Sequence, residues 1–199
     1  MQNILLFGKW DTSKVVVSDP GLRRYINLNP VIIPKTYGRF CTRSLDKVKI
    51  NIVERFINKL YVSGHSGKKH KITSGRHVGK YEMLCKHVRK VFELIEKRTK
   101  QNPLQVLVRA IENAALYGEV VSYRVGGIMA RKAVITSPQR RLDIALRLIA
   151  QAIKKSAFSK RKELAEVIAE QLIEIYNNDP RNNVIRERSR IEKEAEGAR

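Results

Sequence analysis

Apolar residues recur at helical spacing along most of the chain after Ser44. Five successive stripes each place their apolar side chains on one face, which predicts five amphipathic helices. Their apolar positions are Ile52, Val53, Phe56, Ile57 and Leu60; Tyr81, Leu84, Val88, Val91, Phe92 and Ile95; Leu104, Leu107, Val108, Ile111 and Ala115; Leu142, Ala145, Leu146, Ile149 and Ile153; and Leu164, Val167, Ile168, Leu172 and Ile175.

Helix start signals agree with these stripes. Asn102 precedes Pro103 and Ser137 precedes Pro138, the order in which a capping side chain is followed by proline at the first helical position. Ser159 is the predicted start of the last of the five helices. The pattern therefore predicts a mainly α protein, a bundle of about five to six helices.

One segment departs from the helical period. Residues 119–136 read EVVSYRVGGIMARKAVIT, with β-forming residues on both sides of Gly126-Gly127. This predicts a two-stranded hairpin whose turn uses the positive φ angles available to glycine. A lone hairpin is marginal in water, so we expect it to protrude from the helical body and to contact a partner.

The two ends of the chain follow other patterns. Residues 1–43 contain several prolines and little periodicity, which predicts an irregular N-terminal extension. Residues 181–199 alternate in charge sign, which predicts a solvated helix or a tail that orders only on binding. Residues 44–180 form the predicted helical domain with its hairpin, and they include a basic, glycine-rich loop at Ser63–Lys80.

Charge narrows the choice of partner. The 199 residues include 40 Lys and Arg against 19 Asp and Glu, a formal net charge of +21. An excess of this size favours a polyanionic partner, with solubility alone as the other interpretation. The last quarter of the chain is close to charge balance, so the binding charge is concentrated in the first three quarters.

Several classes of protein are disfavoured. No run of about 20 apolar residues is present, so we expect no membrane span. The start of the chain lacks the pattern of a signal peptide. The chain has two cysteines, Cys41 and Cys85, too few for a fold stabilised by disulfide bonds. This favours reduced thiols in the cytoplasm.

A search for catalytic and metal-binding motifs finds none. His65, His70 and His77 lie in the basic loop and have no partners at zinc-finger spacing, so exposed loop side chains are the favoured interpretation. Gly126-Gly127 lacks the spacing of a phosphate-binding loop. We therefore expect no enzyme activity, no metal and no cofactor.

Basic clusters remain as the candidate chemistry. Each one alone has a solvated charged face as its alternative interpretation, but their number favours contacts with RNA phosphates. Aromatic residues are sparse on the hairpin, so recognition of RNA shape and backbone is expected to dominate over base stacking. Outside the hairpin region the candidate RNA-binding residues are Lys35, Arg39 and Arg43; Lys68, Lys69, Lys71 and Arg76; and Lys154, Lys155, Lys160 and Arg161. Arg147 belongs to a further cluster with Arg140 and Arg141.

Four motifs occur in a specific order along the chain. They are VERFINKL (Val53–Leu60), NPLQVLVRAI (Asn102–Ile111), RVGGIMARKAVITSPQRR (Arg124–Arg141) and KKSAFSKRKELAEVIAEQLI (Lys154–Ile173). Together they resemble the universal small-subunit ribosomal protein seven family. The similarity spans roughly residues 4–180, and LFGKW near the start and the insert Gly64–Lys80 resemble the archaeal and eukaryotic branch.

The resemblance implies a structural protein in the head of the small ribosomal subunit, in the cytoplasm. It implies binding to the 3′ major domain of small-subunit rRNA, nucleation of head assembly, and positions near exit-site tRNA, messenger RNA and ribosomal protein eleven. By motif, the implied rRNA contacts are Arg124, Arg131, Lys132, Arg140 and Arg141, and the tip that faces the exit site is Gly126, Gly127, Ile128 and Met129.

Two other classes of function are alternatives. A free-standing DNA-binding regulator is one, because Pro138–Asn177 has the pattern of two helices joined by a short turn. The acidic row of Glu163, Glu166, Glu170 and Glu174 on the second of these helices argues against it. An RNA-modifying enzyme is the other, and it requires catalytic acids or a cofactor loop that the sequence does not display.

Overall fold

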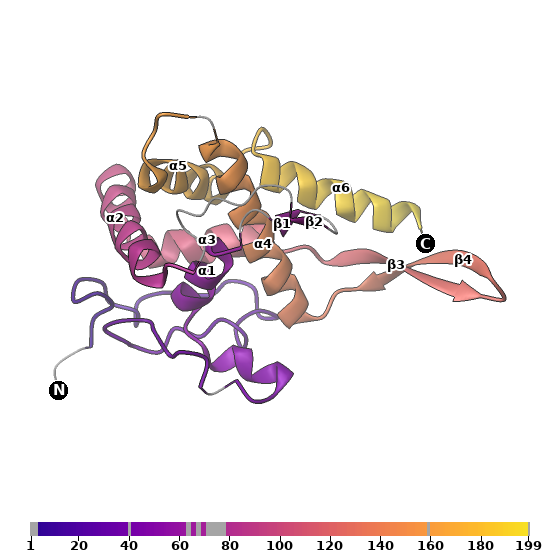
Figure 1. Cartoon of the computed structure of the whole chain (residues 1–199), viewed down its shortest axis with the longest axis horizontal. Coiled ribbons are helices and arrows are strands. Elements are labelled where there is room, and N and C mark those ends of the chain that lie inside the picture. Colours follow the sequence, from indigo (N-terminus) through magenta and orange to yellow (C-terminus); the bar gives the residue numbers. More distant parts are fainter. Residues whose placement is uncertain are drawn as a thin grey trace.

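The computed structural model describes residues 4–39, 41–62, 65–66, 69–70, 79–158 and 160–198. Within these ranges it contains six α-helices, one 3₁₀ helix and two antiparallel strand pairs (Figure 1). The helices are η1 (Ser44–Lys49), α1 (Ile52–Leu60), α2 (Tyr81–Thr99), α3 (Pro103–Ala114), α4 (Pro138–Ala157), α5 (Leu164–Tyr176) and α6 (Asn183–Gly197). The strands are β1 (His65–Ser66), β2 (Lys69–His70), β3 (Gly118–Val125) and β4 (Ile128–Ile135). The prediction of a mainly α protein with a protruding β-hairpin is confirmed.

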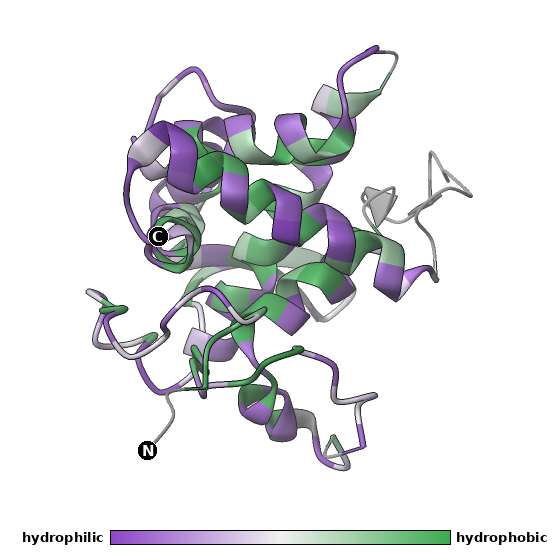
Figure 2. Cartoon of the chain, turned by 90° about the vertical axis from the view of Figure 1, so that its left-hand side faces the viewer, coloured by the Kyte–Doolittle hydropathy of each residue, from purple (hydrophilic) through white to green (hydrophobic). Residues whose placement is uncertain are grey.

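The core lies among the helices. α5 contacts α2, α3 and α4, and α1 contacts α2 and α4. The predicted stripes face this interior: Phe56, Phe92, Leu107, Ile149 and Ile168 are all fully buried. Figure 2 shows hydrophobic and hydrophilic residues alternating around the helices, as expected of amphipathic elements. Each large apolar side chain buried in this way contributes about 1.5–3 kcal/mol to folding.

The helix starts follow the predicted signals, with two differences. The Asn102 side chain accepts a hydrogen bond from the Leu104 amide at 3.0 Å, as predicted, but Ser137 makes no such bond although α4 does begin at Pro138. α5 begins at Leu164, not at Ser159. A start at Ser159 would place Lys160, Arg161 and Lys162 at the positive end of the helix dipole, whereas the observed start places Glu166 in the first turn.

The hairpin is regular from base to tip. β3 and β4 pair in register from Gly118 with Ile135 to Val125 with Ile128, which leaves a two-residue turn. The turn residues Gly126 and Gly127 have φ angles of 53° and 87°, the left-handed conformation that a type I′ hairpin turn requires. The hairpin extends beyond the helices on one side of the molecule (Figure 1).

The segment before η1 has no helix or regular strand in its described part, but it belongs to the core. Leu6, Trp10, Leu22 and Ile26 are buried in the same apolar cluster as the helices. The Trp10 ring packs edge-to-face on Phe92, with 5.4 Å between the ring centroids. The N-terminal extension is therefore irregular, as predicted, and several of its apolar residues pack in the core with the helices.

The C-terminal segment is ordered on the molecule itself. Residues 183–197 form α6, which contacts β3, β4 and α4 and buries Val184, Ile185 and Ala195. The Tyr117 amide donates a hydrogen bond to Glu192 Oε1 at 3.1 Å. Of the two predicted alternatives, a helix with a largely solvated surface agrees with α6. The sequence did not predict that its few buried apolar residues attach this helix to the rest of the molecule.

Candidate nucleic-acid interface

The hairpin presents its cations on two faces. Cross-strand partners share a face, and faces alternate along each strand. The pairings Arg124 with Met129 and Ser122 with Arg131 therefore place both arginines on one face, and Lys132, paired with Val121, lies on the other. All three cations are exposed, and none forms an ion pair within the described part of the chain. Two adjacent arginines are thus available to phosphates on a single face.

The tip of the hairpin is apolar. Ile128 is 75% exposed, and its neighbours Val125 and Met129 are also exposed. Among the described residues, a Cβ added to Gly126 or Gly127 would meet no atom within 4 Å. The glycines are needed for the backbone conformation of the turn, and the space around them is open.

Arg140 and Arg141 follow the hairpin at the start of α4 and differ completely in environment. The Arg140 side chain is 57% exposed and forms a bidentate pair with Glu119, which raises its pKa. Arg141 is buried: Nε donates to the Leu116 carbonyl at 3.1 Å and Nη2 to Asp19 Oδ2 at 2.7 Å. Its guanidinium also lies 4.3 Å from the centre of the Tyr117 ring. Arg141 is thus fully used inside the protein, and we leave it out of the proposed interface.

A cationic groove that the sequence did not reveal lies beside Arg140. This α4 groove has a volume of about 340 Å³ and is lined by Lys59, Ser137, Gln139, Arg140, Asp143, Ile144 and Arg147. Burial, followed by repulsion from Lys47, Arg147 and Arg55, lowers the pKa of Lys59, although Asp143 opposes the shift. A phosphate in the groove would relieve that repulsion.

Sequence reasoning missed Lys59 because its neighbours come from another helix. One local signal was present: Arg140, Asp143 and Arg147 are spaced i, i+3 and i+7, which puts them on one face of α4. The carboxylate of Asp143 is already engaged, since it accepts a hydrogen bond from Arg55 Nη2 at 3.1 Å.

Other predicted cations lie in different parts of the molecule. Lys154 and Lys155 are at the far end of α4, about 20 Å from Arg140 at 1.5 Å per residue. Burial lowers the pKa of Lys154, whereas Lys155 is exposed. Lys160 and Arg161 follow them and are exposed. This second cluster is therefore separate from the α4 groove.

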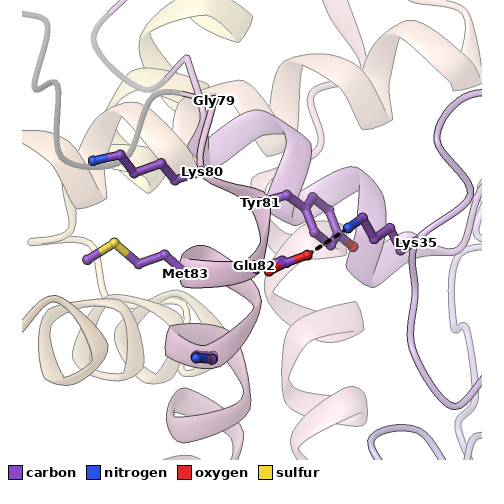
Figure 3. Close-up of a pocket in the computed structure, with 7 residues that line it drawn as sticks. Lys35, Gly79, Lys80, Tyr81, Glu82 and Met83 are labelled. Carbon is purple, nitrogen blue, oxygen red and sulfur yellow. Dashed lines mark hydrogen bonds and ion pairs between the residues drawn. The ribbon is translucent and has the colours of Figure 1, made fainter.

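Of the N-terminal cations, Lys35 is bound to α2, whereas Arg39 and Arg43 have only local contacts among the described residues. Lys35 Nζ pairs with Glu82 Oε1 at 3.1 Å and lies near the Tyr81 ring, as Figure 3 shows. Arg39 lies over the ring of Tyr37 at 5.8 Å. The Arg43 amide donates to Asp46 at the start of η1.

The predicted basic loop is described only in part. Lys68, Lys71 and Arg76 lie outside the described residues, and Lys69 is described only through the backbone of β2.

Two acids of the acidic row at α5 already form ion pairs with lysines. Glu163 pairs with Lys90 at 2.6 Å and Glu170 with Lys162 at 2.9 Å.

The fold and this surface together define a mainly helical, strongly cationic protein with a projecting hairpin, a class typical of nucleic-acid binding. In the part of the chain that the structure describes, no helix is long and apolar enough to cross a membrane. Among the same residues, no group of three or more His, Cys, Asp or Glu side chains is placed to hold a metal ion.

Comparison with known proteins identifies the family. Residues 22–199 match the model of the family described as ribosomal protein S7p/S5e. A small ribosomal subunit protein uS7 from Nanoarchaeum equitans is 47% identical over 194 residues, 98% of both chains. The proteins of the same name from Archaeoglobus fulgidus and Cenarchaeum symbiosum are each 41% identical over 198 residues, all of this chain and 96% and 98% of theirs. The chain belongs to the ribosomal protein S7p/S5e family.

The match changes two expectations from the sequence. It extends to residue 199, so the family likeness includes α6 and the C-terminal segment beyond residue 180. It also removes the basis for a free-standing DNA-binding regulator, since α4 and α5 match the family as parts of one helical body.

Proposed function

We propose that this chain is a structural, non-enzymatic protein of the small ribosomal subunit in the cytoplasm, where it binds rRNA. The observation that carries the proposal is the family match over residues 22–199. Relatives that match almost the full length of the chain are named small ribosomal subunit proteins. The net charge of +21 and the exposed hairpin arginines supply the phosphate contacts that such a role needs.

The finer proposal assigns a place in the subunit. The chain binds the 3′ major domain of the rRNA and nucleates assembly of the head, beside ribosomal protein eleven and other small-subunit proteins. The hairpin reaches toward exit-site tRNA and the messenger path. Its projection from the helical body and its exposed, uncharged tip support this part, because such a tip acts sterically on a neighbouring RNA.

The rRNA contact is tested with variants of equal charge change. Arg124→Ala with Arg131→Ala removes two exposed cations from one hairpin face. The slope of log K against log salt should flatten by about 1.4–1.8, at about 0.7–0.9 per lost contact. Lys97→Ala with Arg98→Ala removes the same charge at the exposed end of α2 and serves as the control. Equal slopes for both variants in filter binding to rRNA would refute the hairpin contact.

The exit-site role is tested by shortening the hairpin. Replacing Arg124–Arg131 with a two-residue turn removes the tip and leaves the α4 groove and the helices intact. Subunits assembled with this variant should still contain the protein but should retain deacylated exit-site tRNA less well or lose reading-frame accuracy. Normal tRNA retention together with normal frame maintenance would limit the hairpin to an rRNA clamp.

A further inference from the structure

Tyr37 is an exposed aromatic residue held in an unusual backbone conformation. Its φ angle is +57°, a left-handed value that is uncommon for residues other than glycine, and the residue is 72% exposed. The preceding Thr36 fixes the turn, because its amide and its hydroxyl both donate to Glu54 Oε1 at 2.9 Å. Glu54 is itself buried in α1. Tyr37 is thus a large aromatic residue that is exposed to solvent and held in a strained backbone conformation. Such strain is typical of binding sites.

Two cations lie near the Tyr37 ring, one from a residue before it in the sequence and one from a residue after it. Lys35 Nζ lies 4.7 Å from the centre of the Tyr37 ring, and the Arg39 guanidinium lies 5.8 Å from it. Hydrogen bonding to Tyr37, and then to Glu82, raises the pKa of Lys35, so the ammonium stays charged beside the ring. An aromatic face next to fixed positive charge is the combination that binds a base together with its phosphate.

A groove continues from Tyr37 to α2. This α2 groove has a volume of about 620 Å³, and Phe7, Ile32 and Ile33 supply its apolar wall. On its other side Glu82, Lys86 and Arg89 are spaced i, i+4 and i+7 along one face of α2.

Hydrogen bonds hold the wall of the groove together and attach it to α2. The Tyr81 hydroxyl donates to the Pro34 carbonyl, and the Phe7 amide donates to the Ile32 carbonyl at 2.8 Å. Lys35 and Glu82, which both line the groove, form an ion pair that Figure 3 shows from the side of the neighbouring pocket around Gly79 and Met83.

We propose that the α2 groove binds one unpaired RNA nucleotide, whose base stacks on Tyr37 and whose phosphates contact Lys35, Arg39 and Lys86. The proposal rests on the proposed function in one respect, that RNA is the partner, and it adds a site that recognises a single-stranded base. The volume of the groove is in the range of ligand pockets.

Charge decides between RNA and a protein segment as the occupant. Three cations line the groove, namely Lys35, Lys86 and Arg89, and Arg39 lies next to Tyr37. The acid that lines it, Glu82, is paired with Lys35, and Arg89 lies 3.9 Å from Glu93, which leaves Lys86 and Arg39 as the cations with no ion pair in the described residues. A phosphodiester backbone matches this excess. An apolar protein segment would fill only the wall formed by Ile32 and Ile33.

Cross-linking of the full-length protein tests the location directly. A ten-nucleotide uridine RNA with one central 4-thiouridine is bound to the protein and irradiated, and the attached peptide is identified by mass spectrometry. We expect attachment at Tyr37 or at the residues that line the α2 groove. Attachment confined to other parts of the chain would overturn the proposal.

Three substitutions at one position test stacking. Tyr37→Phe keeps the ring and should retain affinity for this RNA, whereas Tyr37→Leu keeps an apolar side chain without a flat face. We expect Tyr37→Leu to weaken binding by roughly 5- to 150-fold, which corresponds to ~1–3 kcal/mol for one stacked base. Tyr37→Gly, which relaxes the left-handed backbone, should weaken binding as much as Tyr37→Leu. Equal affinity of Tyr37→Leu and Tyr37→Phe for this RNA would refute the stacking of a base on Tyr37.

The two proposals fail in different ways. Tyr37→Leu should leave the salt slope for folded rRNA unchanged, because no phosphate contact is lost. Arg124→Ala with Arg131→Ala should leave the cross-link at Tyr37 unchanged. If Tyr37→Leu has no effect and rRNA binding persists, only the nucleotide site is refuted, and the groove is then assigned to a protein segment. If the protein binds neither RNA, the proposed function fails as well.

Discussion

Arg140 and Arg141 are adjacent in the sequence, yet the side chain of Arg140 is exposed and that of Arg141 is buried. Arg141 connects three segments, because it binds the Leu116 carbonyl and Asp19 and stacks on Tyr117. Arg140 bonds to Glu119, its one ion-pair partner among the described residues, and remains exposed. The sequence grouped both as RNA contacts, since periodicity on α4 does not reveal how wide its buried face is. α4 contacts α1, α3, α5 and α6, so its buried face is broad enough to include Arg141.

The pair provides the first prediction. Arg141→Ala should lower the free energy of unfolding by about 3 kcal/mol, because it leaves a partly buried carboxylate at Asp19 without its partner. Arg140→Ala should change stability by less than about 1 kcal/mol, since its ion pair is exposed on one side. Urea unfolding of the two variants measures both values, and a larger loss for Arg140→Ala would contradict the assignment.

Asp46 provides a pH prediction at the same scale. Bonding to Lys49, then to the Arg43 amide and the Thr42 hydroxyl, lowers its pKa from 3.8 to about 2. Because the charged form is favoured in the folded protein, its contribution to stability is complete above pH 3.8 and is lost as the pH falls toward about 2. An NMR titration of the Asp46 carboxyl should have its midpoint near 2, and Lys49→Gln should move it upward. A midpoint that Lys49→Gln leaves in place would show that the lysine is not the main cause.

Among the elements, the hairpin presents its cations unequally on its two faces. Lys132 shares its face with the exposed apolar residues Tyr123, Val125 and Ile128, whereas Arg124 and Arg131 lie on the opposite face. We therefore expect one face to contact phosphate. Lys132→Ala should flatten the salt slope for rRNA binding by clearly less than the ~0.7–0.9 expected for each arginine. Equal changes from Lys132→Ala and Arg131→Ala would mean that RNA surrounds both faces.

α6 provides a second prediction at this scale. Ile185 is buried against the rest of the molecule and Lys193 is exposed on the same helix. Ile185→Ala should cost roughly 2–5 kcal/mol of stability, and Lys193→Ala less than about 0.5 kcal/mol. Thermal unfolding followed by circular dichroism measures both. Near-equal midpoints for the two variants would indicate that packing of α6 against the rest of the molecule contributes little to stability.

Local patterns predicted the elements well, because their causes are local. The stripes of α1 to α5 and the Gly126-Gly127 turn depend on residues a few positions apart, and the structure places them as expected. The start of α5 was misplaced because the prediction took Ser159 as a cap and did not weigh the unfavourable charge that Lys160, Arg161 and Lys162 would bring to the start of a helix. The docking of α6 and the α4 groove were missed because both need contacts between segments far apart in the sequence, such as Lys59 with Arg147.

At the scale of the whole molecule, the first residues and the helices share one core. The chain from Val16 to Asp19 is tied to α3, where Gln105 binds both the amide and the carbonyl of Val16 and Glu112 binds the Ser18 and Asp19 amides. The family match begins at residue 22, so part of this core comes from residues that precede it. A segment with no helix or regular strand of its own thus depends on the helices for its structure.

This arrangement predicts a single cooperative unfolding transition, and Trp10 reports on it. Trp10 is the one tryptophan in the chain, it is buried, and its Nε1 donates to Glu96 Oε2 at 3.0 Å. Because Leu6 and Trp10 pack in the same core as Phe92, the N-terminal segment should unfold together with the helices. In urea, the midpoint from Trp10 fluorescence should coincide with the midpoint from helical circular dichroism. Phe92→Ala should lower both midpoints together, as expected for a loss of roughly 3–5 kcal/mol from a shared core. A fluorescence transition at clearly lower urea than the loss of helix would show that residues 4–26 form a separate unit that detaches first.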